Sequence, residues 1–273
     1  MKKLNVLFLL CLLLTLFISC SSDDNKDPDV IFNSITANKS DVYLEESIII
    51  TLDGTGFTES NLTSSNTKMK ITKISNTTYE VSSIDATSGR VYAELRNNTY
   101  SKTKNIPINF YKHGVIDFKM VEGIAINVDS SDKLLKLLGE AEVKTDITGA
   151  TTPTELWEYP SKGVNFVVIK SSKIITSAKV NSSNFYINMP NNSRVFYTKY
   201  PYEIGNGWKI DDANSTMTQV VNKLGNSNSK NTYTTTTLKS YFYLLNNFGL
   251  YFYFYADTED DYNNKTIRSL VVN

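Results

Sequence analysis

The carboxy-terminal part of the chain contains an internal repeat, and this repeat constrains the fold more than any other feature. Leu138-Gly139 recurs as Leu224-Gly225, and Gly163 recurs as Gly249, both at an offset of 86 residues (224 − 138 and 249 − 163). Without a gap, the same offset aligns Leu134, Leu135, Leu156 and Trp157 with Val220, Val221, Phe242 and Tyr243. After a six-residue insertion the offset is 92, which aligns Lys173, Ile175, Ser177 and Val180 with Lys265, Ile267, Ser269 and Val272. The series predicts two copies of one structural unit.

Each copy is predicted to begin with a short helix. In the second copy, apolar residues at i, i+3, i+4 and i+7 form a single stripe, namely Met217, Val220, Val221 and Leu224. Asn214 or Ser215 can cap the start of this helix, and Gly225 can take the left-handed position after its end. The first copy keeps Leu134, Leu135, Leu138 and Gly139, but it has Ser131 where the second copy has Met217.

The helix of each copy is followed by segments with the pattern of strands. In the first copy these are residues 156–159, 163–169 and 174–180, and the alternation of Val164, Phe166 and Val168 marks the face that packs against the helix. A helix on an antiparallel sheet, present twice, is an α+β arrangement. We therefore expect repeat 1 over residues 113–198 and repeat 2 over residues 199–273.

The preceding region, residues 29–112, has the pattern of an all-β sandwich. Short apolar runs bounded by Asn, Ser, Asp and Gly are predicted to be strands, and they cover residues 30–32, 43–52, 69–74, 79–84 and 90–95. The run Asp53-Gly54-Thr55-Gly56-Phe57 predicts a tight turn that returns Phe57 to the core. The chain is thus expected to be multidomain, with this sandwich followed by the α+β tandem repeat.

Two family resemblances follow from these segments. The run Gly54-Thr55-Gly56-Phe57 resembles the turn of IPT/TIG-type immunoglobulin-like modules, and Gly89 to Ala93 suits a late strand of such a fold. That resemblance covers about 80 residues (29–112 at most) and implies a spacer or a binding module.

Residues 120–273 resemble the superfamily of BLIP and the SmpA/OmlA outer-membrane assembly lipoproteins. The resemblance rests on the order of helix, Leu-Gly, aromatic-rich strands and Gly-x-x-Phe, the last at residues 163–166 and 249–252. Beta-lactamase inhibitor proteins are tandem repeats of such a unit. The resemblance implies helices on one sheet face and, on the other, a concave aromatic face that grips a protein partner. It implies binding without catalysis, and it transfers no contact residue to this chain.

The amino terminus predicts a lipoprotein signal peptide over residues 1–19. A basic start, Met1-Lys2-Lys3, precedes an apolar run over residues 4–18 that is too short for a membrane-spanning helix. The ending Phe17-Ile18-Ser19-Cys20 resembles a bacterial lipobox, although Phe17 replaces the usual leucine. The resemblance implies a thioether lipid on Cys20, cleavage before it, and acylation of the freed amine by a chain such as palmitate. Several acyl chains give firm membrane anchoring. The alternative is a secreted protein cleaved nearby.

Residues 20–28 are expected to form an acidic tether. The run Ser21 to Asp27 resembles the export tether of surface lipoproteins in the Bacteroidota, and the alternative is a plain disordered spacer. The expected location is therefore the outer membrane, lipid-anchored and facing the cell surface, with the periplasmic face as the alternative. Cys11 leaves with the signal peptide and Cys20 is acylated, so no disulfide is available.

A candidate binding surface comes from the aromatic run at residues 241–255. If Leu250, Phe252 and Phe254 face the helix, the alternating tyrosines project from the opposite sheet face. The candidate partner-binding residues are Tyr251, Tyr253 and Tyr255, with Tyr241 and Tyr243 on the neighbouring strand. Tyrosine combines a large contact area with a hydrogen-bonding tip and a small entropy loss. The alternative is that aromatic residues simply favour strands.

Catalytic and metal chemistry lack the residues that they need. The single histidine, His113, has no second histidine or free cysteine beside it with which to share a metal. The acidic run Asp257, Glu259, Asp260 and Asp261 has Tyr262 where a calcium loop needs glycine, so a solvated hairpin tip is expected. The adjacent carboxylate pairs Glu45-Glu46 and Asp211-Asp212 are not expected to work as catalytic pairs, because the side chains of consecutive residues usually point in different directions. No phosphate-binding loop or nucleophile elbow occurs.

The charge and composition of the chain exclude several classes of protein. The chain has 28 basic and 28 acidic residues, with 41% hydrophobic and 21% charged residues overall. This composition excludes a nucleic-acid-binding polycation, a disordered chain and a polytopic membrane protein. We expect a non-enzymatic, cofactor-free lipoprotein that is held to the membrane at Cys20 and binds an unknown protein or glycan. The alternative is a structural or assembly lipoprotein of the outer membrane.

Overall fold

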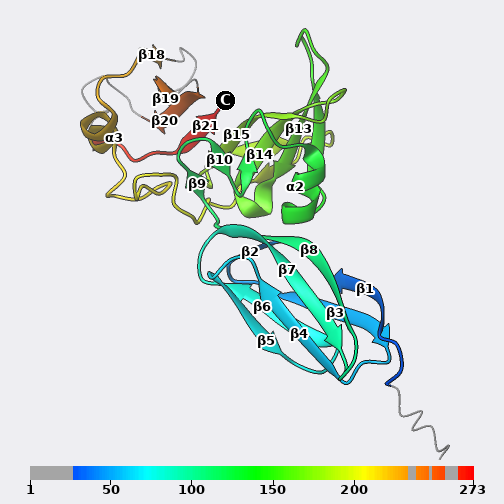
Figure 1. Cartoon of the computed structure of the whole chain (residues 1–273). Helices are drawn as coiled ribbons and strands as arrows, with labels where there is room; N and C mark the ends of the chain where they lie inside the picture. Colours follow the sequence, from blue (N-terminus) through cyan, green and yellow to red (C-terminus); the bar gives the residue numbers. More distant parts are fainter. Residues whose placement is uncertain (1–26, 233–237, 246–247, 256–263) are drawn as a thin grey trace, which may run out of the picture. The chain divides into compact units, whose positions relative to one another are not determined.

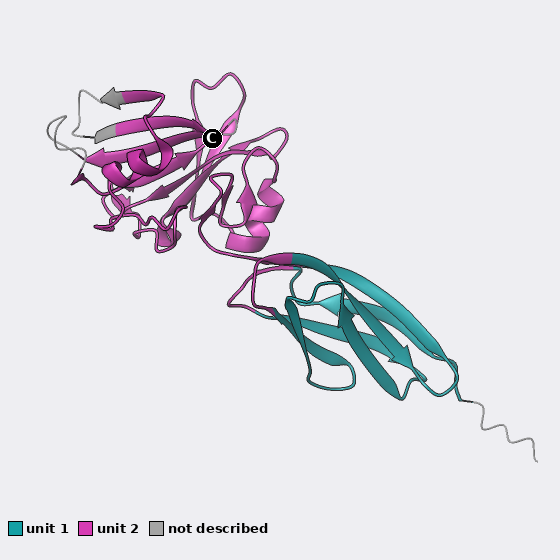
Figure 2. Cartoon of the chain, turned by 60° about the vertical axis from the view of Figure 1, so that its left-hand side comes forward, with its two compact units in different colours: residues 1–40, 47–82, 88–108 teal, residues 41–46, 83–87, 109–273 magenta. Residues whose placement is uncertain are grey.

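The computed structural model describes residues 27–232, 238–245, 248–255 and 264–273, which are mostly β-sheet (Figure 1). The chain divides into two compact units (Figure 2). Unit 1 comprises residues 1–40, 47–82 and 88–108, and unit 2 comprises residues 41–46, 83–87 and 109–273. Within the described residues, no helix is long and apolar enough to cross a membrane.

Two four-stranded sheets contain the strands of unit 1, together with strand β2 and a few strand ends that belong to unit 2. The first has the order β1-β3-β6-β5, with bounds β1 Ile31–Ala37, β3 Ile48–Thr55, β6 Thr78–Ser83 and β5 Met69–Lys73. The second has the order β2-β8-β7-β4, with bounds β2 Asp41–Tyr43, β8 Ser101–Tyr111, β7 Thr87–Arg96 and β4 Glu59–Ser64. Strand β8 continues into unit 2, where its last three residues pair in parallel with β2.

Alternation along the strands explains the core of unit 1. In β3, Ile48, Ile50 and Leu52 are buried while the residues between them are more exposed, and β7 repeats the pattern with Val91 and Leu95. Such alternation gives a sheet one apolar face. The buried set also includes Phe32, Leu62, Met69, Tyr79, Val81, Ala93 and Ile108.

Some details of unit 1 differ from the sequence predictions. The predicted strand over residues 43–52 is two strands, and β4 and β8 were not predicted. Gly54 lies inside β3 rather than in a turn. Glycine is needed there because a Cβ atom would lie 2.4 Å from the carbonyl oxygen of Ile31. Gly56 has φ +73°, a conformation that favours glycine. Phe57 is only half-buried and lies outside the core.

Unit 2 is dominated by one antiparallel eight-stranded sheet with the order β12-β13-β14-β15-β21-β20-β19-β18. Its strands are β12 Val143–Ile147, β13 Thr154–Tyr159, β14 Val164–Ile169, β15 Ile175–Asn181, β18 Ser229–Thr232, β19 Leu238–Leu245, β20 Phe248–Tyr255 and β21 Ser269–Val272.

Two helices and several short elements complete unit 2. The helices are α2 Ser131–Leu138 and α3 Met217–Leu224, and a single 3-10 turn covers Pro160–Lys162. A small three-stranded sheet contains β9 Val115–Ile116, β10 Met120–Val121 and β11 Ile124–Ala125, and a hairpin contains β16 Tyr186–Asn188 and β17 Arg194–Phe196. We call residues 131–181 the first half and residues 217–272 the second half.

The same contacts occur in both halves. The amide of Ser131 donates to the carbonyl of Lys173 (2.9 Å), and the amide of Met217 donates to that of Lys265 (3.2 Å). Each helix is followed by a glycine with φ +81°, Gly139 or Gly225. A tyrosine hydroxyl then donates to the carbonyl of that glycine, Tyr159 to Gly139 at 3.1 Å and Tyr243 to Gly225 at 3.2 Å.

Strand pairing corrects the gapless alignment of the two halves. Tyr159 pairs with Val164, and Tyr243 pairs with Leu250, the residue aligned with Val164. Tyr243 therefore occupies the place of Tyr159, at an offset of 84 residues (243 − 159), rather than the place of Trp157. The segment from Tyr243 to Leu250 is two residues longer than that from Tyr159 to Val164 (250 − 243 = 7 against 164 − 159 = 5). The segment from Gly225 to Tyr243 is two residues shorter than that from Gly139 to Tyr159 (243 − 225 = 18 against 159 − 139 = 20), so the two differences cancel and a gapless comparison does not detect them.

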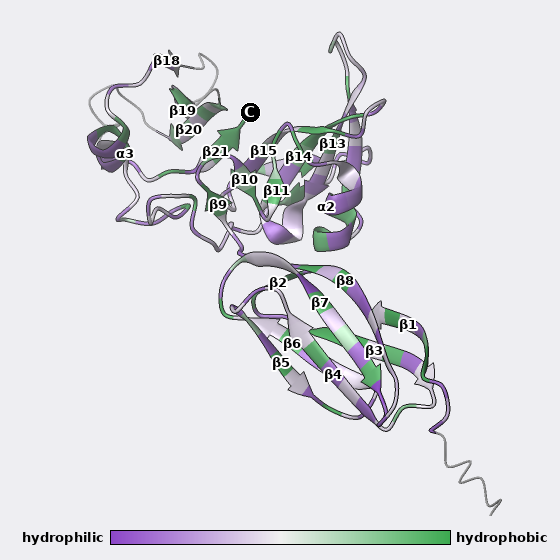
Figure 3. Cartoon of the chain, viewed as in Figure 1, coloured by the Kyte–Doolittle hydropathy of each residue, from purple (hydrophilic) through white to green (hydrophobic). Residues whose placement is uncertain are grey.

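The predicted helix cap is also corrected. The residue before α3 is Thr216, which forms a capping box with Gln219; the backbone amide of Thr216 donates to Gln219 Oε1 at 2.8 Å. Ser215 is not the cap, because its hydroxyl oxygen accepts a hydrogen bond from the amide of Lys209 (2.8 Å). The helices bury one side each, and the hydropathy colouring shows apolar and polar bands alternating along α2 (Figure 3).

Candidate functional site

Three predicted tyrosines lie on the sheet face opposite the core. In β20, Leu250, Phe252 and Phe254 are fully buried in the core, and the residues that alternate with them are half-buried. We call Tyr251, Tyr253 and Tyr255 the tyrosine face. The rings of the first two stack at a centroid distance of 6.5 Å. One strand thus presents a continuous aromatic row on the side of the sheet away from α2 and α3.

Tyr241 and Tyr243 do not belong to this surface. They are only 5% and 1% exposed, and both lie in the core. The cause is register, because Tyr243 pairs with Leu250 and Tyr241 pairs with Phe252, and paired residues share a sheet face. Their inclusion among the partner-binding residues was wrong.

The neighbours of these buried tyrosines take the outer positions on β19. Phe242 is half-buried and its ring lies 4.7 Å from that of Tyr251, while Leu244 is 55% exposed. The sequence contained the strict alternation, but the loop length that sets the phase between β19 and β20 decided which residues face outward.

The β16–β17 hairpin adds aromatic residues that the sequence analysis missed. Phe185, just before β16, stacks on Tyr255 at 6.2 Å, and Tyr186 packs on Phe196 at 5.4 Å. Phe196 is 57% exposed, and the guanidinium of Arg194 lies 4.4 Å from the ring of Tyr186. Two adjacent aromatic pairs, Phe185-Tyr186 and Phe196-Tyr197, were the available signal, but the packing of Phe185 on Tyr255 is a tertiary contact.

A polar network lies on the same sheet face in the first half. Tyr197 donates to the buried carboxylate of Glu158 at 2.7 Å, and Asn165 Nδ2 donates to the Tyr197 hydroxyl at 3.0 Å. Burial raises the pKa of Glu158, although Tyr197 and Lys179 act in the opposite direction. The outer face of the first half is therefore occupied by residues of the chain itself.

Lys179 joins this network to the tyrosine face. Its ammonium lies 4.1 Å from the ring of Phe185 and 5.7 Å from that of Tyr253. Burial lowers the pKa of Lys179 to about 8, and the nearby charge of Glu158 opposes the shift only in part. Cations over aromatic faces are stabilised by the ring quadrupole.

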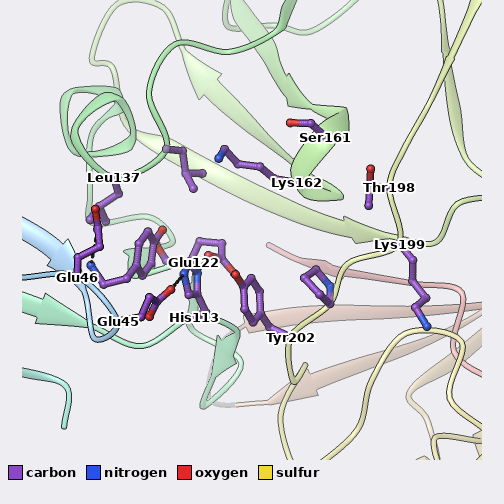
Figure 4. Close-up of a pocket in the computed structure, with 13 residues that line it drawn as sticks. Glu45, Glu46, His113, Glu122, Leu137, Ser161, Lys162, Thr198, Lys199 and Tyr202 are labelled. Carbon is purple, nitrogen blue, oxygen red and sulfur yellow. Dashed lines mark hydrogen bonds and ion pairs between the residues drawn. The ribbon is translucent and has the colours of Figure 1, made fainter. Parts of the chain in front are cut away.

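A second cluster of side chains surrounds the single histidine (Figure 4). All of its members belong to unit 2. The His113 ring is stacked between the rings of Tyr43 and Tyr202, at centroid distances of 3.6 Å and 4.1 Å. Its Nδ1 contacts the carboxylate of Glu122, and its Nε2 lies 2.5 Å from Oε1 of Glu45. Both ring nitrogens therefore face carboxylates.

Glu122 is the buried centre of this cluster. Its side chain is only 3% exposed, and it accepts hydrogen bonds from the amide of Gly114 at 3.1 Å and from the hydroxyl of Tyr200. Its own carbonyl oxygen accepts from the Tyr43 hydroxyl at 3.0 Å. Glu122 also has φ +53°, which is uncommon for a residue other than glycine. The contacts of one glutamate thus join four segments of unit 2.

The cluster borders a cavity of about 420 Å³. Its lining combines aromatic, apolar and charged side chains, including Tyr202, Leu137, Leu138, Glu46, Lys162 and Lys199. Burial lowers the pKa of His113, but the hydrogen bonds and charges of Glu122 and Glu45 more than offset this, so the pKa lies above its ordinary value. This cluster was not predicted, because His113 has no metal-binding or catalytic partner among its sequence neighbours, and Glu45 and Glu122 lie apart from it along the chain.

The remaining predicted residues lie elsewhere. Cys20 and the acidic run Asp257, Glu259, Asp260 and Asp261 fall outside the described residues. Within the part of the chain that the structure describes, no group of three or more His, Cys, Asp or Glu residues is arranged to hold a metal ion.

Comparison with known proteins finds no matching family model and no matching curated protein.

Proposed function

We propose that this protein is a lipid-anchored lipoprotein of the cell envelope that binds a protein or glycan partner through the tyrosine face. The observation that carries the proposal is the row formed by Tyr251, Tyr253 and Tyr255, half-exposed on the sheet face opposite the core. The role is non-catalytic and cofactor-free. Tyrosines in such a row offer both ring area and hydroxyl groups to a ligand.

The comparison between the halves supports a binding role for these tyrosines. At the offset of 86, Tyr251, Tyr253 and Tyr255 replace Asn165, Val167 and Ile169 of the first half. The framework of helix, glycine and strands is the same in both halves, so it does not require tyrosine at these positions. Residues in excess of what folding needs are candidates for recognition.

The architecture that accompanies this function is an immunoglobulin-like IPT/TIG module followed by tandem BLIP/SmpA-OmlA-like repeats. Two four-stranded sheets in unit 1 support the first assignment. Recurrence of the helix, glycine and tyrosine contacts in unit 2 supports the second. In this arrangement unit 1 is a spacer between the acylated Cys20 and the binding unit, at the outer membrane and facing the cell surface.

Replacing the anchor residue tests the envelope location. We expect Cys20→Ser to abolish incorporation of a fatty-acid probe and to release the protein or leave it as a precursor, because the thiol is the lipid acceptor. Metabolic labelling with an alkyne fatty acid measures this. Undiminished labelling of the variant would exclude Cys20 as the lipidation site.

Exchanging tyrosines for first-half residues tests the binding surface. The double variant Tyr251→Asn/Tyr253→Val should lose binding by about 2 kcal/mol or more, because interface tyrosines are often hot spots. The assay is retention of components of an outer-membrane extract on immobilised protein. Tyr92→Ser, which removes a 42%-exposed tyrosine of unit 1, is the matched control and should retain them.

The same experiment distinguishes the alternative function. A stable complex with endogenous envelope proteins that both variants keep would favour a structural or assembly lipoprotein. Components lost only from the double variant support recognition through the tyrosine face.

A further inference from the structure

The contacts of His113 require two protons on its ring. Each ring nitrogen faces a carboxylate oxygen, Nδ1 that of Glu122 and Nε2 that of Glu45. A carboxylate only accepts hydrogen bonds, so both nitrogens must carry hydrogen for both contacts to be favourable. Neutral imidazole carries one hydrogen, and one carboxylate would then face a lone pair. The arrangement is therefore complete only for the imidazolium form.

The two carboxylates differ in how easily they can leave. Glu122 is held by Gly114 and Tyr200 as well as by His113, and its side chain is 3% exposed. Glu45 has a side chain that is 59% exposed and lies in the turn after β2. When His113 loses a proton, Glu45 can move into water at little cost, whereas Glu122 cannot. Deprotonation should thus release the segment that contains Glu45.

The position of Glu45 gives this release a structural consequence. A second cavity of about 410 Å³ shares four lining residues with the first, namely Glu45, His113, Pro201 and Tyr202. Because these residues line both cavities, the two cavities adjoin, and we infer that the shared residues form the wall between them. Movement of Glu45 would remove part of that wall and join the cavities.

Other charged side chains also line the two cavities beside His113. The first cavity adds Glu46, Lys162 and Lys199, and the second adds Lys112, Glu203 and Lys209. Both cavities contain charges of both signs, and the two directly bound carboxylates have the main charge effects on the ring. The stacked Tyr43 and Tyr202 and the nearby Tyr200 have raised pKa values, chiefly from burial, so they stay neutral near pH 7.

We propose that His113 is a protonation-dependent latch. Its imidazolium holds the Glu45 arm, which is the turn of residues 44–46 after β2, beside Glu122, and loss of its proton releases that arm and opens the wall between the two cavities. Because the pKa of His113 is raised in the folded state, the latch is fully closed below the unfolded pKa of about 6.5. It opens as the pH rises through the higher folded pKa.

The experiment uses the fact that the chain has a single histidine. In the full-length protein, the Cε1–H resonance of His113 reports its titration by NMR without assignment. We expect a pKa above about 6.5 in the wild type. Glu45→Gln removes the exposed partner and should lower that pKa by about 0.3–0.7 unit, the range expected for a solvent-exposed pair.

A second measurement follows the arm itself. The amide of Leu44 donates to the backbone carbonyl of Tyr111, and the amide of Glu46 donates to the backbone carbonyl of Tyr43, both at 3.0 Å. Their hydrogen-exchange protection factors, corrected for the intrinsic rate at each pH, should fall about 5–10-fold as His113 deprotonates. In His113→Gln the same factors should not change with pH over that range.

Glu59→Gln is the matched control. Glu59 is also a surface carboxylate, but it pairs with Arg96 in unit 1, so the variant should leave the His113 titration unchanged. The proposal is overturned if the wild-type pKa is at or below about 6.5, if Glu45→Gln leaves it unchanged, or if protection of Leu44 and Glu46 is constant through the titration.

Discussion

The two halves of unit 2 share a framework but differ on one sheet face. Both have an eight-residue helix followed by a positive-φ glycine, and both have a fully buried phenylalanine in the core, Phe166 in the first half and Phe252 in the second. On the opposite face the first half is covered by Tyr197, which follows β17 and bonds to Glu158 and Asn165, whereas the second half presents tyrosines.

This difference shows which positions the fold controls. Residues on the helix-covered face must fill a close-packed interior, so they keep their size and apolar character. Residues on the other face need only suit a strand, and each half has used that freedom differently. In the first half a residue of the chain itself lies on this face, and in the second half a row of half-exposed tyrosines lies there.

The most sensitive test of the shared framework is to truncate the equivalent core residues. Phe166→Ala and Phe252→Ala should each destabilise the protein by about 3–5 kcal/mol, because each removes a fully buried ring and leaves a cavity. Chemical denaturation followed by circular dichroism measures the loss. A loss below about 1 kcal/mol in only one half would contradict an equivalent core.

A stability change of intermediate size is expected at the middle of the outer sheet face. Lys179 of β15 and Val271 of β21 are equivalent positions in the two halves, at the offset of 92 residues, and they are also paired across the two strands. Lys179→Val makes the two positions identical. The folded pKa of Lys179 is about 8, below the ordinary 10.5, so between these values the unfolded state binds more protons.

Wild-type stability should therefore rise with pH across that window relative to Lys179→Val, by about 1 kcal/mol per pH unit. Denaturant titrations of both proteins at pH 7, 8, 9 and 10 give the difference. A difference that stays constant with pH would mean that Lys179 titrates normally and that the Phe185 contact does not bury its charge.

The smallest stability change is expected for the exchange of outer-face residues. Tyr251→Asn/Tyr253→Val gives the second half the residues of the first and should change the free energy of unfolding by no more than about 1–2 kcal/mol, as for other half-exposed strand positions. Thermal melts of this variant beside Tyr92→Ser measure the change. A loss as large as that of Phe252→Ala would mean that the tyrosines are part of the structural core.

Much of the framework could be predicted from local patterns. The stripe that includes Met217 and Val220 predicted α3, and the alternation of Val164, Phe166 and Val168 predicted the inner face of β14. These patterns are visible in one sequence because helix and strand periods are set by the backbone. The cap was misplaced by one residue, since Ser215 and Thr216 have similar capping chemistry and a contact with Lys209 decides between them.

The sites depended on information that no local pattern contains. His113, Glu45 and Glu122 are far apart in sequence, and only the folded chain brings their charges together. Likewise, the outward direction of Tyr251 was predictable from alternation within β20, but the inward direction of Tyr241 was fixed by its pairing with Phe252.

The sequence by itself determined the periodicities, the duplicated glycines and the surplus of tyrosine in the second half. The folded chain sets the phase between β19 and β20, the contact of Tyr197 with Glu158 on the outer face of the first half, and the pairing of His113 with two carboxylates. The physical reason is that backbone geometry acts over a few residues, whereas strand register, burial and ion pairing depend on which distant segments meet.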